Sequence, residues 1–503
     1  MRYFPRIIIF VFAALQLLRL PTFPRFMDIY YHLQSAWGFI QAGGYSTWDF
    51  WEYAPFGRPH IYPPLFQILL ALLMKAGVSV VLLAKLFEGA SPVVFLIILW
   101  DFIRKNYGEE LGLFVTVAFC SSFAFFTFLS NHIPASLALI LGFLALGELF
   151  KKRVLRAVIL LALCFYTHIS VPWFFVLSCA VFAAMNKDSR KDTLRVIFYS
   201  LLLALPILAF ELKNLPFIKM VGNDFPVKFH LQVKVLDYIL AGFGLFLAAK
   251  MAPRYRLFIS LFLAGFIFLS YPFRFLSAEG YLPVILLFAL AMQWIWQWLK
   301  VRMFKAKRMV MGALILFILF VSPALILDKP AGSKRVSYKM EWMDSALSGI
   351  LLGKGNSIWF PRMYLPAADI IKENSTKDDI IYSGINFSGV VLGALAQRAT
   401  SNAIFPEVPP SVRVNPLSVA NIILLPKDLN EEFIKSISLK YKLAKVGESE
   451  HFSVFRNPTT AYSLKIRKAA FSFREIGIVL LLFAVVFFWK KKSELKKMLE
   501  FFN

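Results

Sequence analysis

The chain has 503 residues, of which 59% are hydrophobic and only 17% are charged, and its mean hydropathy is +0.65. A soluble domain carries a larger share of charge, so this composition indicates a polytopic membrane protein. The net charge of +25 does not indicate nucleic-acid binding, because the basic residues cluster in short connections between apolar segments, as the positive-inside rule describes. Cys120, Cys164 and Cys179 all lie within apolar segments, which argues against disulfides and against a cysteine metal site.

Apolar segments along the chain predict about twelve membrane spans. The first span follows Arg2 and Arg6 without a small-residue cleavage site, so we expect it to be retained, with a cytoplasmic N-terminus. Residues 62–77 begin with Pro63-Pro64, and we expect them to lie on or dip into the outer leaflet, because only then do the basic connections share the cytoplasmic side. The C-terminus is then cytoplasmic as well. The expected spans are 6–20, 79–103, 110–130, 133–150, 154–168, 169–185, 194–212, 232–249, 257–271, 281–299, 308–326 and 474–489.

One long segment of ordinary polarity, residues 328–471, falls on the outer side and predicts a small external α/β domain. The chain then consists of a membrane domain over 1–327 with a catalytic external loop at 21–61, this α/β domain, and a last span with a basic cytoplasmic tail over 472–503. Loop 213–231, which contains Asp224 and Lys228, also faces outside, and we expect it to act as a lid. The expected strands are 380–382 and 422–425, the expected helices are 367–373, 390–397 and 431–436, and a hairpin is expected at 441–456.

Asp28 directly follows the first span at the depth of the membrane surface. An ionisable group is costly there unless it is solvated, paired or functional. Its carboxylate suits a general base or a metal ligand. Asp also favours the first position before a helix, so Asp28 could instead cap a helix over 30–40. Position alone leaves both alternatives open.

Arg274 lies at the outer end of an apolar span, where its planar guanidinium suits a phosphate or pyrophosphate held by two hydrogen bonds. A snorkelling arginine or an ion pair with Glu279 is the alternative. Arg58 and His60 in the first loop are further phosphate candidates, and packing within a turn would explain them equally well.

His132 and His168 each stand at an outer boundary of a span. A single histidine there is usually structural, but two of them on the same face as Asp28 favour a site for a divalent cation such as Mn²⁺ or Mg²⁺. The chain has no glycine-rich phosphate loop and no Walker lysine, which argues against a nucleotide-driven pump.

The first loop resembles the first external loop of GT-C glycosyltransferases. Within that superfamily it is most similar to the catalytic subunit of oligosaccharyltransferase, including the archaeal type. The resemblance implies a multi-span membrane domain with an external soluble domain, and a sugar or glycan donor on a polyprenyl phosphate or pyrophosphate carrier. The loop residues Tyr31, His32, Arg58 and His60 are then expected to contact substrate. The resemblance rests on Asp28-Ile29-Tyr30-Tyr31-His32, Gly43-Gly44-Tyr45, Trp48-Asp49, Pro55-Phe56-Gly57-Arg58 and Tyr62-Pro63-Pro64-Leu65.

Two further places agree with the family pattern and two depart from it. Phe273-Arg274, followed by Leu282-Pro283, resembles the late-span arginine that contacts the carrier phosphate, and 381–402 resembles the segment around the acceptor-recognition motif. The W-W-D-Y-G motif itself is absent near 384–388, and a second acidic motif is absent near Asn131-His132. The resemblance therefore carries over Asp28, as base or metal ligand, and Arg274, as phosphate contact.

Together these features predict a polytopic glycosyltransferase that transfers a sugar, with inversion, from a polyprenyl (dolichyl) phosphate or pyrophosphate to a protein, lipid or glycan acceptor on the outer membrane face. The resemblance favours an archaeal cell membrane. Two alternatives stay open: a transporter or flippase of lipid-linked sugars, and a non-catalytic subunit of a glycosylation complex. A flippase would place charges deep within spans, whereas Lys85, Glu148 and Glu211 lie near span ends, which disfavours it.

Overall fold

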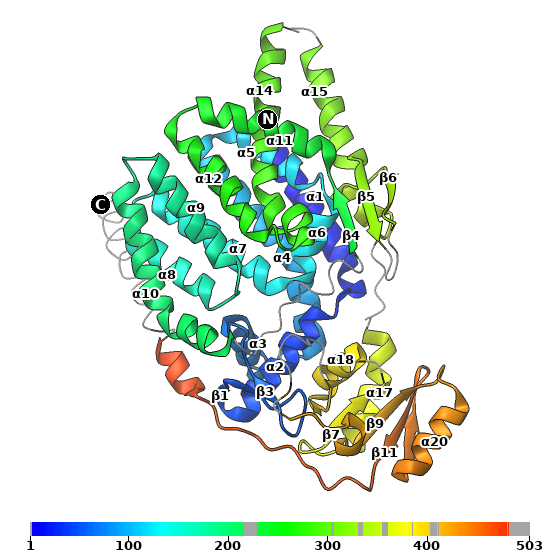
Figure 1. Ribbon diagram of the computed structural model, residues 1–503. Helices are drawn as coiled ribbons and strands as arrows, with labels where there is room; N and C mark the ends of the chain where they lie inside the picture. Colours follow the sequence, from blue (N-terminus) through cyan, green and yellow to red (C-terminus); the bar gives the residue numbers. More distant parts are fainter. Residues whose placement is uncertain are drawn as a thin grey trace, which may run out of the picture. The chain divides into compact units, whose positions relative to one another are not determined.

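A computed structural model describes residues 3–215, 229–302, 306–329, 335–354, 361–384, 386–402, 410, 412–479 and 481. The chain is mostly helical and divides into two compact units (Figure 1). Unit 1 consists of Met1–Ile29, Ala84–Leu208 and Met220–Phe360, and unit 2 of Tyr30–Leu83, Ala209–Lys219 and Pro361–Asn503. Each unit is therefore assembled from segments that are far apart in the sequence.

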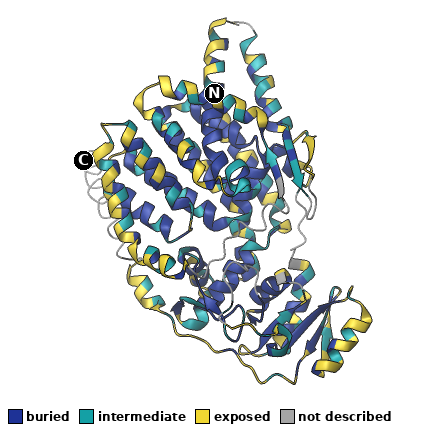
Figure 2. Cartoon of the chain, in the orientation of Figure 1, coloured by how far each residue is buried: buried dark blue, intermediate teal, exposed yellow. Residues whose placement is uncertain are grey.

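Unit 1 is a helical bundle in which α11, α12 and α14 pack on one another, as do α7, α8 and α9 (Figure 1). Its interior is dark blue in Figure 2, where apolar side chains are buried, and its outer helix faces are exposed. Gly244 shows how closely two helices approach, because a Cβ there would lie 1.9 Å from the Leu287 backbone oxygen. The helices are α1 (Phe4–Arg19), α4 (Val80–Tyr107), α5 (Glu109–Phe119), α6 (Phe123–Asn131), α7 (Ile133–Phe150), α8 (Val154–Phe165), α9 (Val171–Met185), α10 (Arg190–Asn214), α11 (Val235–Lys250), α12 (Arg256–Gly265), α13 (Pro272–Ser277), α14 (Leu282–Arg302), α15 (Lys307–Leu316) and α16 (Ala346–Leu351).

Five helices of the described chain are long and apolar enough to cross a membrane, which identifies an integral multi-pass membrane protein. This is fewer than the twelve expected spans. Two of the expected segments, 154–168 and 169–185, form shorter apolar helices, Val154–Phe165 and Val171–Met185. Helix α3 (Leu65–Lys75) has 11 residues and is about 16 Å long, so it is too short to cross alone. Most of the expected last span, 474–489, lies outside the described residues. The five long helices are Phe4–Thr22, Val80–Tyr107, Ile133–Phe150, Arg190–Asn214 and Pro272–Arg302.

The segment expected as a single span at 110–130 is broken into α5 and α6, which are bent by 84°. The break has a local cause, since the Ser122 side chain caps α6 by accepting from Phe125 N at 3.2 Å. Beside it, the Ser121 hydroxyl donates to the buried Asp237 carboxylate at 2.7 Å, and the Tyr281 hydroxyl also donates to that carboxylate. Counting this bent pair as one span brings the number within the described part of the chain to six.

A three-stranded antiparallel sheet, in the order β4-β5-β6, belongs to unit 1. Its strands are β4 (Phe229–Val233), β5 (Ala324–Lys329) and β6 (Ser337–Glu341). Residues 337–354 therefore fold with the helical unit, although the sequence prediction assigned them to the external domain. The start of β4 falls in the expected lid loop, whose Asp224 and Lys228 lie outside the described residues.

Unit 2 contains a five-stranded sheet in the order β10-β11-β9-β7-β8, in which β7 runs parallel to β8 and β9. The expected strands, helices and late hairpin are all present, so the predicted small α/β region is confirmed. Figure 2 shows its central strands buried and α20 largely exposed. The elements are β7 (Ile380–Ser383), β8 (Ala399–Thr400), β9 (Ile422–Pro426), β10 (Ala444–Glu448) and β11 (Phe452–Arg456), with α17 (Pro361–Glu373), α18 (Asn386–Ala396), α19 (Pro416–Val419) and α20 (Glu431–Tyr441).

The first loop also folds within unit 2 and pairs with this sheet. Thr400 N donates to Trp51 O at 2.8 Å, and Ala54 N donates to Thr400 O at 2.9 Å. In the middle of the loop, β1 (Gly44–Tyr45) pairs with β12 (Phe471–Ser472) so closely that a Cβ on Gly44 would lie 2.0 Å from Phe471 O. The loop therefore continues the α/β unit. Its other elements are α2 (Asp28–Ala42), β2 (Trp48–Asp49) and β3 (Arg58–Pro59).

Candidate functional site

Asp28 and His132, two residues predicted from the sequence, meet in unit 1. Asp28 is the first residue of α2, and its Oδ2 lies 3.8 Å from Nδ1 of His132. His132 separates α6 from α7, and the rings of Phe26 and Phe128 each pack against it with centroids 5.5 Å away. The two side chains are 14% and 33% exposed, so the pair is held in place and still accessible.

Arg274 lies on α13, directly after a residue that contacts His132. The ring of the preceding residue, Phe273, lies 6.3 Å from the His132 ring. Arg274 Nη1 donates to Ser170 Oγ at 2.6 Å and lies 3.4 Å from Glu279 Oε1. The Glu279 side chain is fully buried and accepts no hydrogen bond among the described residues, so Arg274 supplies its counter-charge. Arg274 itself is 28% exposed, which leaves part of the guanidinium available to an anion.

His168 supports Arg274 indirectly. It is buried, and its Nδ1 accepts from Ser170 N at 3.2 Å and from Val171 N at 3.3 Å, which caps the start of α9. Because Ser170 is the residue that binds Arg274, this cap helps to fix the arginine. The structure thus gives His168 a structural role.

The predicted cation ligands Asp28, His132 and His168 do not form a complete site by themselves. No group of three or more His, Cys, Asp or Glu side chains is placed to hold a metal ion within the described ranges. One carboxylate and one imidazole lie side by side, and Mg²⁺ is commonly bound by one or two carboxylates together with substrate phosphates and water. The residues therefore fit a divalent cation only together with oxygens from a substrate, and cation binding stays a prediction.

Arg58 and His60, the other predicted phosphate contacts, are buried inside unit 2. Strands β2 and β3 pair Asp49 with Arg58, whose Nε lies 3.4 Å from Asp49 Oδ2 and which also donates to Glu52. His60 Nδ1 lies 2.5 Å from Asp49 Oδ1. All four side chains are at most 2% exposed. In this structure both residues have the packing role, and their contact with substrate stays a prediction.

The charge balance of this four-residue cluster is uneven, because two carboxylates share one arginine. Burial raises the pKa of Glu52 to about 7, although Arg58 acts in the opposite direction. Burial also opposes the charge of Arg58, yet Glu52 and Asp49 hold the pKa of Arg58 above its ordinary value. The cluster is therefore sensitive to the loss of the arginine.

Tyr31 and His32 are also buried in unit 2. His32 Nδ1 is hydrogen-bonded to Gln67 Nε2 at 3.0 Å, and its ring packs against Tyr31, Tyr62 and Phe66. Burial raises the pKa of Tyr31 well above its ordinary value. These contacts join α2 to α3 and account for the aromatic character of the first loop. Substrate contact by Tyr31 and His32 stays a prediction.

Sequence reasoning did not find two residues that this geometry brings forward. Ser170 binds Arg274, and Glu88 contacts the backbone just before Asp28. Glu88 had a usable signal, since it is an ionisable residue inside the apolar segment 79–103. Ser170 had none, because a serine at the start of a helix is common.

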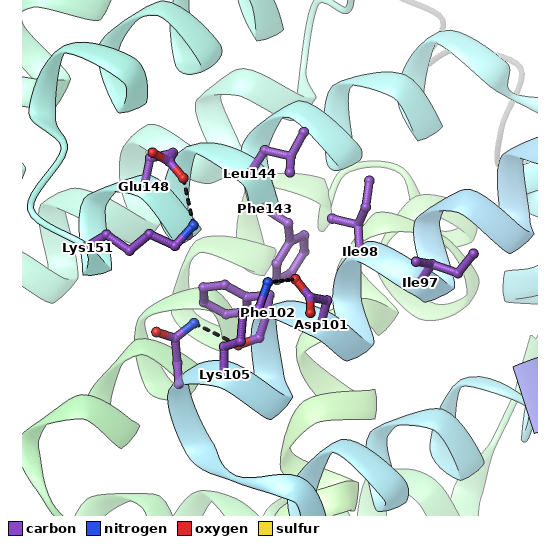
Figure 3. Close-up of a pocket in the computed structure, with 11 residues that line it drawn as sticks. Ile97, Ile98, Asp101, Phe102, Lys105, Phe143, Leu144, Glu148 and Lys151 are labelled. Carbon is purple, nitrogen blue, oxygen red and sulfur yellow. Dashed lines mark hydrogen bonds and ion pairs between the residues drawn. The ribbon is translucent and has the colours of Figure 1, made fainter. Parts of the chain in front are cut away.

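A pocket of about 160 Å³ lies between α4 and α7 in unit 1, with Lys105, Asp101, Glu148 and Lys151 at its edge (Figure 3). Each lysine in it is paired, Lys105 with Asp101 at 2.6 Å and Lys151 with Glu148 at 2.7 Å. Glu148 is about 24 Å along α7 from His132. The pocket is therefore separate from the predicted site.

No family model matches the sequence. No curated protein matches it either. Solved structures do match. The archaeal oligosaccharyltransferase AglB from Archaeoglobus fulgidus, in complex with an inhibitory peptide and a dolichol-phosphate, has a TM-score of 0.57 at 10% identity, over 87% of this chain and 71% of that one. ArnT from Cupriavidus metallidurans, bound to undecaprenyl phosphate, has a TM-score of 0.55 at 11% identity, over 90% of this chain and 98% of that one.

Both proteins are GT-C membrane glycosyltransferases. This chain has a GT-C-like fold. The fold predicted from the first loop is therefore confirmed, although the identities are low. ArnT in its apo state gives the same result, with a TM-score of 0.55 at 11% identity over 90% of this chain and 97% of that one.

Proposed function

We propose that this protein is a glycosyltransferase that uses a sugar linked to a polyprenyl (dolichyl-type) phosphate or pyrophosphate on the outer membrane face. The GT-C-like fold supports this class, and two similar structures hold a dolichol-phosphate and an undecaprenyl phosphate. The observation that carries the proposal is the run of contacts from Asp28 through His132 and Phe273 to Arg274. These contacts support a shared site for the Asp28 carboxylate and the Arg274 guanidinium, both of which are partly exposed.

Arg274 is the proposed contact for the carrier phosphate. A guanidinium already held by Ser170 Oγ is oriented before substrate arrives, so little rotamer freedom is lost on binding. Its pairing with Glu279 leaves it partly exposed, and an incoming phosphate would share it with that buried carboxylate. Fixed positive charge at this place stabilises the negative charge that develops on the leaving phosphate.

Asp28 is the proposed base. Its carboxylate takes the proton from the acceptor hydroxyl or amide as the acceptor attacks the anomeric carbon, with inversion, and the carrier phosphate leaves. His132 Nδ1 lies 3.8 Å from this carboxylate. A divalent cation held by Asp28 and His132 would supply further charge stabilisation. A protein, a lipid and a glycan are all acceptors compatible with this chemistry.

The test is sugar transfer from a radiolabelled pool of polyprenyl-linked sugars by membranes that contain wild-type protein or Asp28→Ala, with and without chelator. We expect the variant to release no polyprenyl phosphate at a normal protein level, and loss of wild-type activity with chelator would support the cation. Equal transfer by both proteins would remove Asp28 from the chemistry. Transfer by neither, with a suitable pool, would favour a flippase or a non-catalytic subunit.

A further inference from the structure

One turn of α4 contacts the chain just before Asp28 through hydrogen bonds and close packing. Glu88 is 1% exposed, and its Oε1 accepts from Arg25 N at 2.6 Å while its Oε2 lies 3.5 Å from Phe26 N. The next residue, Gly89, lies so close to Phe23 that an added Cβ would be 3.3 Å from that ring. Unit 1 thus holds residues 23–26 against one short stretch of a membrane-spanning helix.

The acid at this position has a physical reason. A buried carboxylate is very unfavourable unless hydrogen bonds and charges compensate it, and its two oxygens can accept from two consecutive backbone N–H groups. Arg19 and Arg25 lie close enough to interact with Glu88 electrostatically. A glutamine would retain one acceptor oxygen but would turn an NH₂ group toward the second backbone donor.

Residues 23–26 lead directly to the proposed site. Phe26, whose backbone faces Glu88, packs its ring on His132, and His132 contacts the Asp28 carboxylate. Only Met27 lies between Phe26 and Asp28. We propose that Glu88 is a positioning residue that sets the location of Asp28 relative to His132. This inference rests on the proposed role of Asp28 in sugar transfer.

Hydrogen exchange of the full-length protein in detergent tests the contact itself. In Glu88→Ala we expect the amides of Arg25 and Phe26 to exchange about tenfold faster, because a charge-assisted hydrogen bond is lost. Glu88→Gln should recover most of the protection at Arg25. The matched control is Glu148→Ala, which removes a largely buried acid from α7. The partners of Glu148 are Lys151, Arg153 and Arg156, which follow α7 in the sequence.

Sugar transfer from the same radiolabelled pool tests the consequence. We expect Glu88→Ala to lower kcat by about 10- to 100-fold with a donor KM within about threefold of wild type, because a displacement near 1 Å is enough for such a loss. Glu88→Gln should restore most of kcat, and Glu148→Ala should change neither constant.

Unchanged exchange in Glu88→Ala, or equally faster exchange in Glu148→Ala, would overturn the inference. So would faster exchange with normal kcat in Glu88→Ala when Asp28→Ala is inactive. If Asp28→Ala is itself fully active, the proposed base is wrong, and that result is separate from the exchange measurement.

Discussion

Replacing Arg58 with alanine separates a structural role from a substrate contact. Arg58 is 2% exposed and pairs with Asp49 and Glu52, which are 2% and 0% exposed. The variant leaves two buried carboxylates without their cation, and breaking such a pair costs about 3–5 kcal/mol. For a unit of roughly 150–250 residues, this corresponds to a fall in melting temperature of about 6–20 °C.

The loss should depend on pH. Burial raises the pKa of Glu52 to about 7, so near pH 6 this carboxyl can take up a proton and reduce the uncompensated charge. Removing Arg58 takes away the charge that lowers this pKa, so above pH 7 the variant must either ionise Glu52 without its cation or keep the proton, whereas the wild type ionises Glu52 beside Arg58. We therefore expect Arg58→Ala to lose more thermal stability at pH 8 than at pH 6, measured as the midpoint of loss of the monodisperse peak after heating in detergent.

Arg153→Ala is the matched control, because Arg153 is 38% exposed and lies 3.6 Å from Glu148, and such pairs contribute about 1 kcal/mol or less. If Arg58→Ala has normal thermal stability and a raised donor KM, the structural role is refuted. Contact between Arg58 and the carrier phosphate would then be the better explanation.

Three further outcomes are expected. Arg274→Ala should raise the donor KM about tenfold or more, and Ser170→Ala should raise it less, because the latter removes only the 2.6 Å hydrogen bond that orients the guanidinium; equal kinetics for Arg274→Ala and wild type would exclude the contact. His132→Ala should lower kcat while the melting temperature stays within about 2 °C, since its side chain is one-third exposed; a protein that is unstable but fully active per folded molecule would contradict this. Between pH 4.5 and 7 the folded state holds more protons on Glu52 than the unfolded state, so this group makes stability fall as pH rises, and Glu52→Gln should flatten that part of a melting-temperature profile.

The strands and helices of the α/β region could be predicted because their sequence patterns are local. The run 422–425 is wholly apolar and forms the central strand β9, whose five residues are all buried. The boundary of that region could not be predicted, because residues 337–341 form β6 by pairing with β5, and β5 in turn pairs with β4 about a hundred residues earlier. Among the described residues, five helices, or six with the bent pair, have the length and composition of a span, which is fewer than hydropathy predicts for the whole chain. Hydropathy cannot predict a bend such as the one at Ser122, where the serine side chain caps a new helix within an apolar segment.

The sequence predicted that Asp28, His132 and Arg274 lie on one face. In the structure Asp28 contacts His132, and His132 contacts Phe273, the residue before Arg274. Glu279 was an expected alternative partner of Arg274, whereas the contacts of Ser170 and Glu88 were not predicted. Ser170 and Glu88 reach their partners over 104 and 63 residues, and such distances are set only by helix packing. A family motif identifies the residues that carry chemistry. The residues that position them depend on how the helices of this chain pack.

Exposure separates the polar residues of the first loop and its surroundings into two sets. Asp49, Glu52, Arg58 and His60 are at most 2% exposed and are paired with one another, so a substrate could reach them only by breaking buried ion pairs. The three residues Asp28, His132 and Arg274 are 14–33% exposed. An anionic lipid-linked donor can bind to the second set without dismantling the fold. A loop rich in charge thus uses most of that charge to fold, and only the residues at its start and on the facing helix ends remain available for chemistry.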